Sequence, residues 1–462
     1  MPRNIVIYSD GTGQRGGVLF DERRSNIYKL YRATRCGPDS SVDPAEQYAF
    51  YDAGIGTSKG ARGILGATWD FIYNLICRAT GLGLTGNIID CYAALVRNWR
   101  PGDRVFLFGF SRGAYTVRCL GAVIAFCGIP IADGGGPLRR DMKTSKRIAK
   151  EAVKRVYQHT HSRSPDKATQ RQKEQLEQRL EMAERFRTKY RSADGDGANV
   201  YPHFIGVFDT VAAIGNMTLA TFVLGIAALV INFGVVLGVA RWLGLDYGWP
   251  TLLFASVVTI AALAYLGNLI YRMRWEVGLR HSKWWRPFHL LDWRMRFYDM
   301  TLNPKVQYAR HALAIDERRK DFDRVGWGTK GDRPARPDGP EWLQQVWFSG
   351  CHSDVGGSYL EDESRLSDIP LKWMLETAVA VGLKYDERVL KPYPDHTGMQ
   401  HDETRSRAFK WRPKIDRTIP VDAPLHDTVL QRFKTTEVQL YDVFGPYRPE
   451  GLRNHNDTKV FY

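Results

Sequence analysis

The stretch that most constrains the fold runs from Arg104 to Gly128, RVFLFGFSRGAYTVRCLGAVIAFCG. An apolar run from Val105 to Phe110 has the length of a buried strand, and the small and apolar residues after Ser111 have helical spacing. Ser111 lies at the apex of a sharp strand-to-helix turn, with one glycine two residues before it and another two residues after it. This pattern is typical of a nucleophile elbow. We predict that neither glycine position has room for a Cβ atom, because strand and helix pack closely there. Ser111 is therefore the candidate nucleophile.

Two groups of backbone N–H donors could stabilise the oxyanion that forms when a serine attacks a carbonyl. The N–H of Arg112 lies at the N-terminus of the predicted helix, which favours negative charge. The loop Ser9-Asp10-Gly11-Thr12-Gly13, after the first predicted strand, offers the N–H groups of Gly11 and Thr12 as a second source. The same loop could instead be a structural Asx-turn capped by Asp10. The sequence leaves both interpretations open.

Strand and helix patterns alternate through the first part of the chain. Short apolar strands are predicted at 4–8 and 48–52 and helices at 26–32 and 81–99, the last ending at the breaker Arg100-Pro101-Gly102-Asp103. This alternation is typical of parallel strands joined by helical crossovers. It predicts a mostly parallel sheet with helices on both faces. Together with the Ser111 elbow, it predicts an α/β-hydrolase-like fold.

Two later strands end in residues suited to complete a catalytic triad. The predicted strand 201–211, YPHFIGVFDTV, carries Asp209 near its C-terminal end, and the predicted strand 342–348 is followed by SGCHSDVGG with His352. Catalytic groups of open α/β sheets gather at the carboxyl ends of the strands, and the chain order Ser, Asp, His is the one that α/β-hydrolases use. We predict that His352 is the base and Asp209 the acid that holds its other ring nitrogen.

Other residues compete for these roles. Asp354 could replace Asp209 as the acid, and His426 is a weaker candidate for the base. Cys351 beside His352 raises the possibility of a cysteine nucleophile, but no elbow surrounds it. Helix capping is the structural alternative for Asp209.

Two segments interrupt the strand and helix alternation. Residues 139–191 are dense in Lys, Arg, Glu and Gln and predict exposed helices, which form either a solvated arm, or a mobile lid or basic membrane-contacting surface. Residues 217–240 and 251–271 contain no Asp, Glu, Lys, Arg or His, and each is long enough as a helix to cross a hydrocarbon core of about 30 Å. A G-x-x-x-G at 234–238 would let two such helices approach closely. We predict a transmembrane hairpin, with a buried core hairpin as the alternative.

The flanks of the hairpin and the overall charge predict its surroundings. The turn between the two helices carries one Arg and one Asp, whereas the residues after the second helix are basic: Arg272, Arg274, Arg280, Lys283 and Arg286. By the positive-inside rule, the catalytic part then faces the cytoplasm, and 283–297, rich in Trp, Phe and Arg, would lie in the headgroup layer. The formal net charge of +15 favours an anionic membrane surface. Nucleic acid is not expected, because there is no basic and aromatic stripe of the single-strand-binding kind.

These patterns divide the chain into four parts. They are a catalytic domain (1–138, 198–216 and 299–400), a charged helical insertion (139–197), a hairpin with an interfacial segment (217–298) and a C-terminal extension (401–462). Six cysteines without C-x-x-C spacing predict reduced thiols, with neither a disulfide framework nor a zinc site.

Five motifs together resemble the bacterial DUF2235 family of α/β-hydrolases, whose best-known members are phospholipase effectors of type VI secretion. The motifs are SDGTG, YDAGIGT, PGDRVFLFGFSRGAYTVR, GVFDTV and WFSGCHSDVGG. The resemblance implies that Ser111 is the nucleophile, Asp209 of FDTV the acid and His352 of HSDVGG the base. It also implies hydrolysis of phospholipid esters without a metal or organic cofactor. The hydrophobic hairpin departs from the family pattern. Two roles are therefore expected as alternatives: a secreted effector and a resident lipid hydrolase of the inner membrane.

The expected function is therefore that of a membrane-associated serine hydrolase cleaving lipid ester bonds, of the phospholipase or lipase type. Its expected partners are a phospholipid or other lipid ester and an anionic membrane surface. A small-ester or thioester hydrolase anchored in the membrane is one alternative. A catalytically inactive membrane scaffold that keeps the α/β-hydrolase fold is another.

Overall fold

The computed structural model describes most of the chain, in thirteen ranges. These are residues 2–11, 23–54, 82–160, 169–211, 217–245, 247–275, 278–280, 288–290, 301–322, 324–328, 340–406, 409–411 and 413–462. The chain divides into two compact units. The first comprises Met1–Tyr157, Ala183–Ala213 and Asp299–Tyr462, and the second Gln158–Met182 and Ile214–Tyr298.

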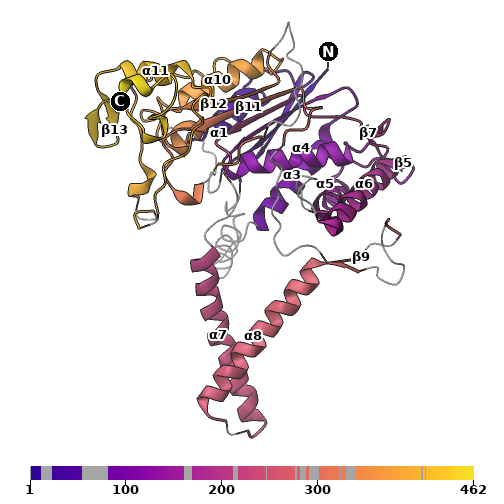
Figure 1. Cartoon of the computed structure of the whole chain (residues 1–462). Helices are drawn as coiled ribbons and strands as arrows, with labels where there is room; N and C mark the ends of the chain where they lie inside the picture. Colours follow the sequence, from indigo (N-terminus) through magenta and orange to yellow (C-terminus); the bar gives the residue numbers. More distant parts are fainter. Residues whose placement is uncertain are drawn as a thin grey trace. The chain divides into compact units, whose positions relative to one another are not determined.

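A six-stranded parallel sheet forms the centre of the first unit (Figure 1). Its strands are β1 (Asn4–Ser9), β2 (Gln47–Asp52), β3 (Arg104–Phe110), β8 (Phe204–Phe208), β11 (Tyr308–Ala314) and β12 (Leu343–Phe348). They lie in the order β12-β11-β8-β3-β1-β2, and every neighbouring pair is parallel. The predicted fold class is confirmed. The chain order reverses between β1 and β3, and such switch points are where open α/β sheets bind ligands.

Helices cover both faces of this sheet. On one face, α1 (Asn26–Thr34) and α10 (Asp368–Val379) contact each other and pack on alternate strand residues: Val6, Tyr8, Phe106, Phe108 and Phe204. On the other face lie α3 (Leu82–Asn98) and α4 (Arg112–Cys127), and Gly121 of α4 packs against Leu107 and Ile205. Strands with apolar side chains on both faces are typical of fully covered parallel sheets.

The remaining elements are short or lie outside the sheet. They are β4 (Ala132–Asp133), β5 (Gly136–Pro137), α5 (Met142–Lys150), the π-helix η1 (Glu151–Val156), α6 (Gln170–Tyr190), β6 (Ala193–Asp194), β7 (Gly197–Ala198), α7 (Met217–Trp242), α8 (Trp249–Arg272), β9 (Met273–Trp275), β10 (Phe288–Leu290), α9 (His352–Gly356), α11 (Asp427–Lys434), β13 (Val438–Leu440) and β14 (Val443–Gly445). Short 3₁₀ turns are η2 (Tyr157–His159), η4 (Lys320–Phe322), η5 (Glu403–Arg405), η6 (Glu450–Leu452) and η7 (Lys459–Phe461).

The charged segment that begins at residue 139 is helical, but its first half is not an exposed arm. α5 packs on α3, and α5 and η1 bury five apolar side chains: Ile148, Ala149, Ala152, Val153 and Val156. The expectation of exposed helices is wrong for the end of α6, which buries Ala183, Phe186 and Tyr190, and it is wrong for 142–156. Its charged residues occupy one side of the helix while a narrow apolar stripe joins the core, as in ordinary amphipathic helices.

One interior strand of the sheet, β11, is missing from the sequence-based prediction. It lies between β8 and β12, yet its sequence YARHALA contains Arg310 and His311, which break the apolar run. Both side chains are buried, and the Arg310 guanidinium donates to the carbonyl oxygens of Ala309 (2.8 Å) and Glu341 (2.9 Å). Backbone carbonyls therefore satisfy a charge that would otherwise be costly to bury.

The second unit contains the two apolar helices α7 and α8, which contact each other. The side-chain amide of Asn232 donates to the carbonyl oxygen of Ser256 across this contact (3.1 Å). Within the described residues, one segment, Trp249–Gly267 of α8, is long and apolar enough to cross a membrane. Only 11% of that segment is buried in the structure, whereas the core helix of a soluble domain would be mostly buried.

The C-terminal residues pack on the β11 and β12 end of the sheet. They form a second apolar cluster with both strands: Leu313, Ile315, Trp347, Ile419, Ala423, Val429, Phe433, Val438, Tyr447 and Leu452. The polar and Pro-rich C-terminal extension therefore shares a core with the sheet.

Candidate active site

Ser111 occupies a strained turn between β3 and α4. Its backbone angles, φ 58° and ψ −120°, are unfavourable for a residue with a Cβ atom. Its N–H donates to the carbonyl oxygen of Phe208 (3.1 Å), which ties the turn to the end of β8. A Cβ on Gly109 would lie 2.5 Å from the carbonyl oxygen of Gly113, and one on Gly113 would lie 2.0 Å from that of Ser9. The prediction that these glycine positions have no room for a side chain is confirmed.

Asp209 and His352 form a buried hydrogen-bonded pair. Asp209 directly follows β8, the neighbour of β3 in the sheet, and His352 begins α9 after β12. The two atoms His352 Nδ1 and Asp209 Oδ2 are 2.5 Å apart. The exposed fractions of the two residues are 3% and 0%. The structure thus brings together the two residues predicted as base and acid.

The His352 ring lies beside the elbow, but its second nitrogen is unsatisfied. The ring centroid is 4.7 Å from that of Phe110, the residue before Ser111, and 5.0 Å from that of Phe322. His352 Nε2 is buried and has no hydrogen-bond partner among the described residues, Ser111 included. Catalytic hydrogen bonds are often absent or long in ligand-free enzymes and tighten when substrate binds.

Arg417 holds the other side of the Asp209 carboxylate. Its Nη1 is 2.5 Å from Oδ1 and its Nη2 is 3.0 Å from Oδ2, and the N–H of Ala314 also donates to Oδ1 (3.1 Å). Burial by itself would raise the pKa of Asp209, but the Arg417 guanidinium and the His352 hydrogen bond outweigh it. The pKa therefore lies well below its ordinary value, and Asp209 is ionised. An ionised carboxylate accepts the Nδ1–H of His352 and leaves Nε2 able to take a proton.

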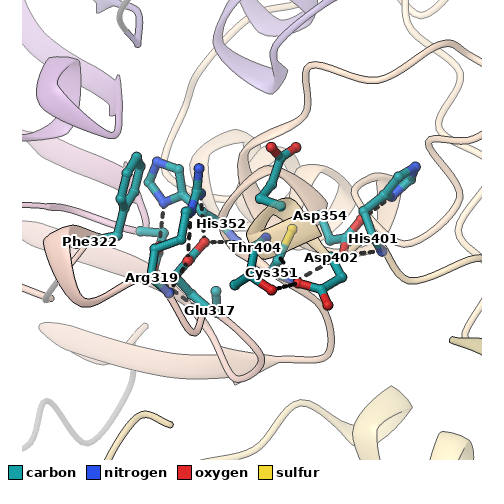
Figure 2. Close-up of polar contacts among 12 residues, drawn as sticks. Glu317, Arg319, Phe322, Cys351, His352, Asp354, His401, Asp402 and Thr404 are labelled. Carbon is teal, nitrogen blue, oxygen red and sulfur yellow. Dashed lines mark hydrogen bonds and ion pairs between the residues drawn. The ribbon is translucent and has the colours of Figure 1, made fainter. Parts of the chain in front are cut away.

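A second ion pair holds the start of α9 (Figure 2). The N–H of His352 donates to Glu317 Oε2 (3.2 Å), and the Glu317 carboxylate accepts from Arg319 Nε (2.8 Å) and Nη2 (2.7 Å). The Arg319 guanidinium lies 3.6 Å above the ring of Phe322, which in turn faces the His352 ring. Burial alone would raise the pKa of Glu317, but the Arg319 hydrogen bonds outweigh it and lower the pKa. A fixed negative charge therefore lies at the N-terminus of α9, where it is favourable.

Asp354, the alternative acid, is engaged with a different histidine. Its Oδ1 is 2.7 Å from Nδ1 of His401, and its Oδ2 accepts the N–H groups of Cys351 (2.9 Å) and His401 (3.0 Å) (Figure 2). In this structure the acid bonded to His352 is Asp209, and Asp354 links α9 to the C-terminal residues.

The remaining candidates lie apart from the Asp209–His352 pair or are poorly suited to chemistry. His426 caps α11 through Thr428, and its ring stacks on Phe348 at 4.8 Å. Cys351 is buried, and burial raises the pKa of its thiol well above the usual value, which disfavours the nucleophilic thiolate. Across the described ranges, no group of three or more His, Cys, Asp or Glu side chains is placed to hold a metal ion.

The expected oxyanion donors need one correction. The N–H of Gly11 donates to Asp10 Oδ1 (2.7 Å), so in this structure it is committed to a local turn. Asp10 also accepts from two hydroxyl groups and is buried, which agrees with a structural role for this loop. Thr12 lies outside the described residues. Arg112 is the first residue of α4, so its N–H lies at the end of the helix where the helix dipole favours negative charge.

A sequence profile of a known family matches most of the chain. The profile describes the catalytic domain of Tle1-like phospholipase effectors of type VI secretion, and it matches residues 3–233 and 266–377. The chain belongs to the Tle1-like family. The DUF2235 resemblance is consistent with this assignment.

Three relatives show how far the similarity extends. An uncharacterized protein of Saccharomyces cerevisiae is 25% identical over 434 residues, which cover 83% of this chain and 58% of the yeast protein. A crystal structure of an uncharacterized Pseudomonas aeruginosa protein has 15% identity and a TM-score of 0.37, covering 85% of this chain and 49% of that one. The structure of the Tle1 effector bound to the VgrG spike of the type 6 secretion system has 16% identity and a TM-score of 0.29, covering 79% and 52%. The chain thus spans between 49% and 58% of the length of these relatives.

Arg417 is the site residue that sequence reasoning missed in this Tle1-like chain. It lies in the stretch KIDRTIP, which has no motif and no apolar periodicity. It also lies beyond residue 377, where the family profile ends. No local signal distinguishes Arg417 from the exposed arginines of the chain, because its partner is 208 residues away in the sequence.

Replacing Gly113 by alanine should destabilise the fold strongly. The new Cβ would lie 2.0 Å from a backbone oxygen of β1, which cannot move without breaking the sheet, so we expect a loss of about 3 kcal/mol, the upper end of the usual cost of overpacking. Gly86 in α3 is the matched control, because a Cβ there has no atom within 4 Å and alanine should be neutral or stabilising by up to about 1 kcal/mol. Urea unfolding of both variants measures the difference. Equal stabilities would contradict the close packing at the elbow.

The His401–Asp354 pair should make stability depend on pH. Burial alone would lower the pKa of His401, but the Asp354 hydrogen bond and neighbouring carboxylates outweigh it and raise the pKa. Because the folded state holds the proton more tightly, this stabilisation is complete below about pH 6.5 and is lost as pH rises through the folded-state pKa. Between about pH 6 and pH 9, the Tm of the wild type should therefore fall more than that of His401→Gln. Parallel Tm curves would show that the pair does not bind a proton on folding.

Proposed function

We propose that this Tle1-like domain is a serine hydrolase that cleaves lipid ester bonds with Ser111, His352 and Asp209. The observation that carries the proposal is the buried hydrogen bond between Asp209 and His352 at the strand edge where the strained Ser111 elbow lies. Family membership supports a lipid ester as the substrate.

In the proposed mechanism, Ser111 Oγ attacks the acyl carbonyl carbon and its proton passes to His352 Nε2. The N–H of Arg112 donates to the oxyanion at the N-terminus of α4. Collapse of the tetrahedral intermediate releases the alcohol part of the lipid, which takes the proton from His352. Water then hydrolyses the acyl-serine by the same route. Throughout, Asp209 holds the Nδ1–H and stabilises the imidazolium.

We further propose that α7 and α8 anchor the protein in a membrane as a hairpin, with the catalytic part on the cytoplasmic side. The support is the exposed apolar surface of α8, where large side chains such as Phe254 (71% exposed) and Leu263 (61% exposed) have no covering layer among the described residues. The basic residues after α8 support the orientation. After a carbonate wash, the full-length protein should remain in the membrane fraction. Release into the supernatant would contradict the anchor.

Active-site labelling tests the proposed chemistry. The full-length protein in detergent should react with a fluorophosphonate probe, and peptide mass spectrometry should find the adduct on Ser111. Phospholipid vesicles should be hydrolysed faster than short soluble p-nitrophenyl esters. Faster hydrolysis of the short esters would instead indicate a small-ester hydrolase, and failure to label would indicate an inactive scaffold.

A further inference from the structure

Four hydrogen-bond donors surround the Asp209 carboxylate and fill its four acceptor positions. Oδ1 accepts from Arg417 Nη1 and the N–H of Ala314, and Oδ2 accepts from Arg417 Nη2 and His352 Nδ1. A carboxylate offers about four lone-pair sites, so none is left over. The carboxylate plane is thus defined by its partners, and one of its oxygens is directed at His352.

The Arg417 side chain is itself fixed in place. Besides Asp209, Nη1 donates to the carbonyl oxygen of Ala314 (2.9 Å) and Nη2 to that of Phe322 (3.0 Å). The side chain is 7% exposed. A guanidinium is a planar fork that matches a carboxylate with two parallel bonds, which lysine cannot reproduce.

On both sides of Arg417, the backbone is hydrogen-bonded to the loop after β11 or to β12. Before it, the N–H of Ile415 donates to the carbonyl oxygen of Arg318 (2.9 Å), in the loop after β11. After it, Trp347 of β12 exchanges hydrogen bonds with Pro424 and His426, both 2.9 Å. Arg417 therefore enters the site from a segment that is held at both ends.

We propose that Arg417 is a positioning residue of the hydrolase, which orients the Asp209 carboxylate toward His352 so that the C-terminal segment completes the active site. This inference rests on the proposed triad. Two consequences distinguish it from a purely structural role. Without the fork, Asp209 can rotate, and misplacement by about 1 Å is enough to reduce kcat about 100-fold. Without the positive charge, Asp209 attracts the His352 imidazolium more strongly, so the acid limb of the pH–rate profile should move up by about one pH unit.

Substituting Arg417 leaves the other charged and titratable residues around the Asp209–His352 pair in place. They are Glu317 and Arg319 after β11, His311 within β11, and Asp354 on α9. A shift of the acid limb can therefore be assigned to the charge at position 417.

The experiment compares full-length variants by hydrolysis of a soluble p-nitrophenyl ester across pH. Arg417→Ala should lose about 100-fold in kcat, with KM little changed, and should show the shifted acid limb. Arg417→Lys should keep the wild-type limb but recover only part of kcat. Arg432→Ala is the matched control, because Arg432 is fully buried and its guanidinium donates to three backbone carbonyls, of His396, Gly398 and Gln439. Arg432→Ala should be less stable than the wild type, but the acid limb of its pH–rate profile should stay at the wild-type pH.

A double-variant cycle completes the test. If Arg417 acts through Asp209, Asp209→Asn with Arg417→Ala should be no slower than Asp209→Asn alone, whereas independent structural damage would multiply the losses. Wild-type kcat and pH profile in folded Arg417→Ala would overturn the positioning role. If Arg417→Ala does not fold, full kcat in Arg417→Lys would overturn the requirement for the guanidinium fork. Activity that survives in Ser111→Ala would instead overturn the triad itself, so the two failures can be told apart.

Discussion

Ser111→Ala is expected to abolish ester hydrolysis, with kcat reduced by roughly 10⁵- to 10⁶-fold. Removing the nucleophile leaves only the binding surface and the oxyanion donors, which accelerate hydrolysis weakly on their own. Initial rates on phospholipid vesicles and on a p-nitrophenyl ester measure the loss, and fluorophosphonate labelling should disappear with it. A variant that stays active would show that the elbow serine is not the nucleophile.

A second substitution at the same position separates activity from folding. Ser111 has a positive φ of 58°, which is unfavourable for a residue with a Cβ atom but accessible to glycine. Ser111→Gly should therefore be as inactive as Ser111→Ala but more stable than the wild type, by about 1 kcal/mol. A more stable and inactive variant would demonstrate that the fold stores strain where the chemistry takes place. A less stable glycine variant would contradict that interpretation.

Asp209→Asn should lose both activity and stability. An amide cannot hold the Nδ1–H of His352 as a carboxylate does, and loss of the triad acid costs about 10⁴-fold in rate. The substitution also leaves the Arg417 guanidinium facing a neutral group in a buried site, which should cost about 3 to 5 kcal/mol. Steady-state kinetics and urea unfolding measure the two losses separately.

The same variant should change the acid dependence of stability. Because the pKa of Asp209 is depressed, its stabilising contribution is present above the unfolded-state pKa of about 4 and is lost as pH falls toward the folded value. Asp209→Asn should lack this component of acid unfolding. Asp354→Asn is the matched control: it breaks the link to His401 but should reduce the rate far less than Asp209→Asn does if Asp209 is the acid. The reverse ranking would assign the acid to Asp354.

The parts of the site that sequence could predict are those with strong local patterns. The Ser111 elbow combines an apolar strand, two glycines and a helix within one short stretch, and sterics alone require that arrangement. Asp209 and His352 each follow a recognisable apolar strand, and parallel strands end at the same edge of a sheet. From these rules the sequence alone predicts that Asp209 and His352 lie close together.

The parts that sequence could not predict depend on contacts between distant residues. β11 contains a buried arginine and histidine, so its apolar pattern is broken, and its place in the sheet is decided by its neighbours β8 and β12. Gly11 was expected to donate to an oxyanion, but its N–H is captured by the adjacent Asp10 side chain. The role of Arg417 depends on a carboxylate far away in the chain. Tertiary context outweighs local propensity in each case.

The second apolar cluster has a consequence for how this protein is divided for experiments. A fragment that stops where the shared catalytic sequence stops, at residue 377, would expose Trp347 and Leu313 to water and leave an ionised carboxylate at Asp209 without its counter-charge. The end of the sequence shared with the family and the end of the segment that folds as one unit therefore differ by some eighty residues. The smallest piece of this chain that can work as a unit extends well into its least recognisable part.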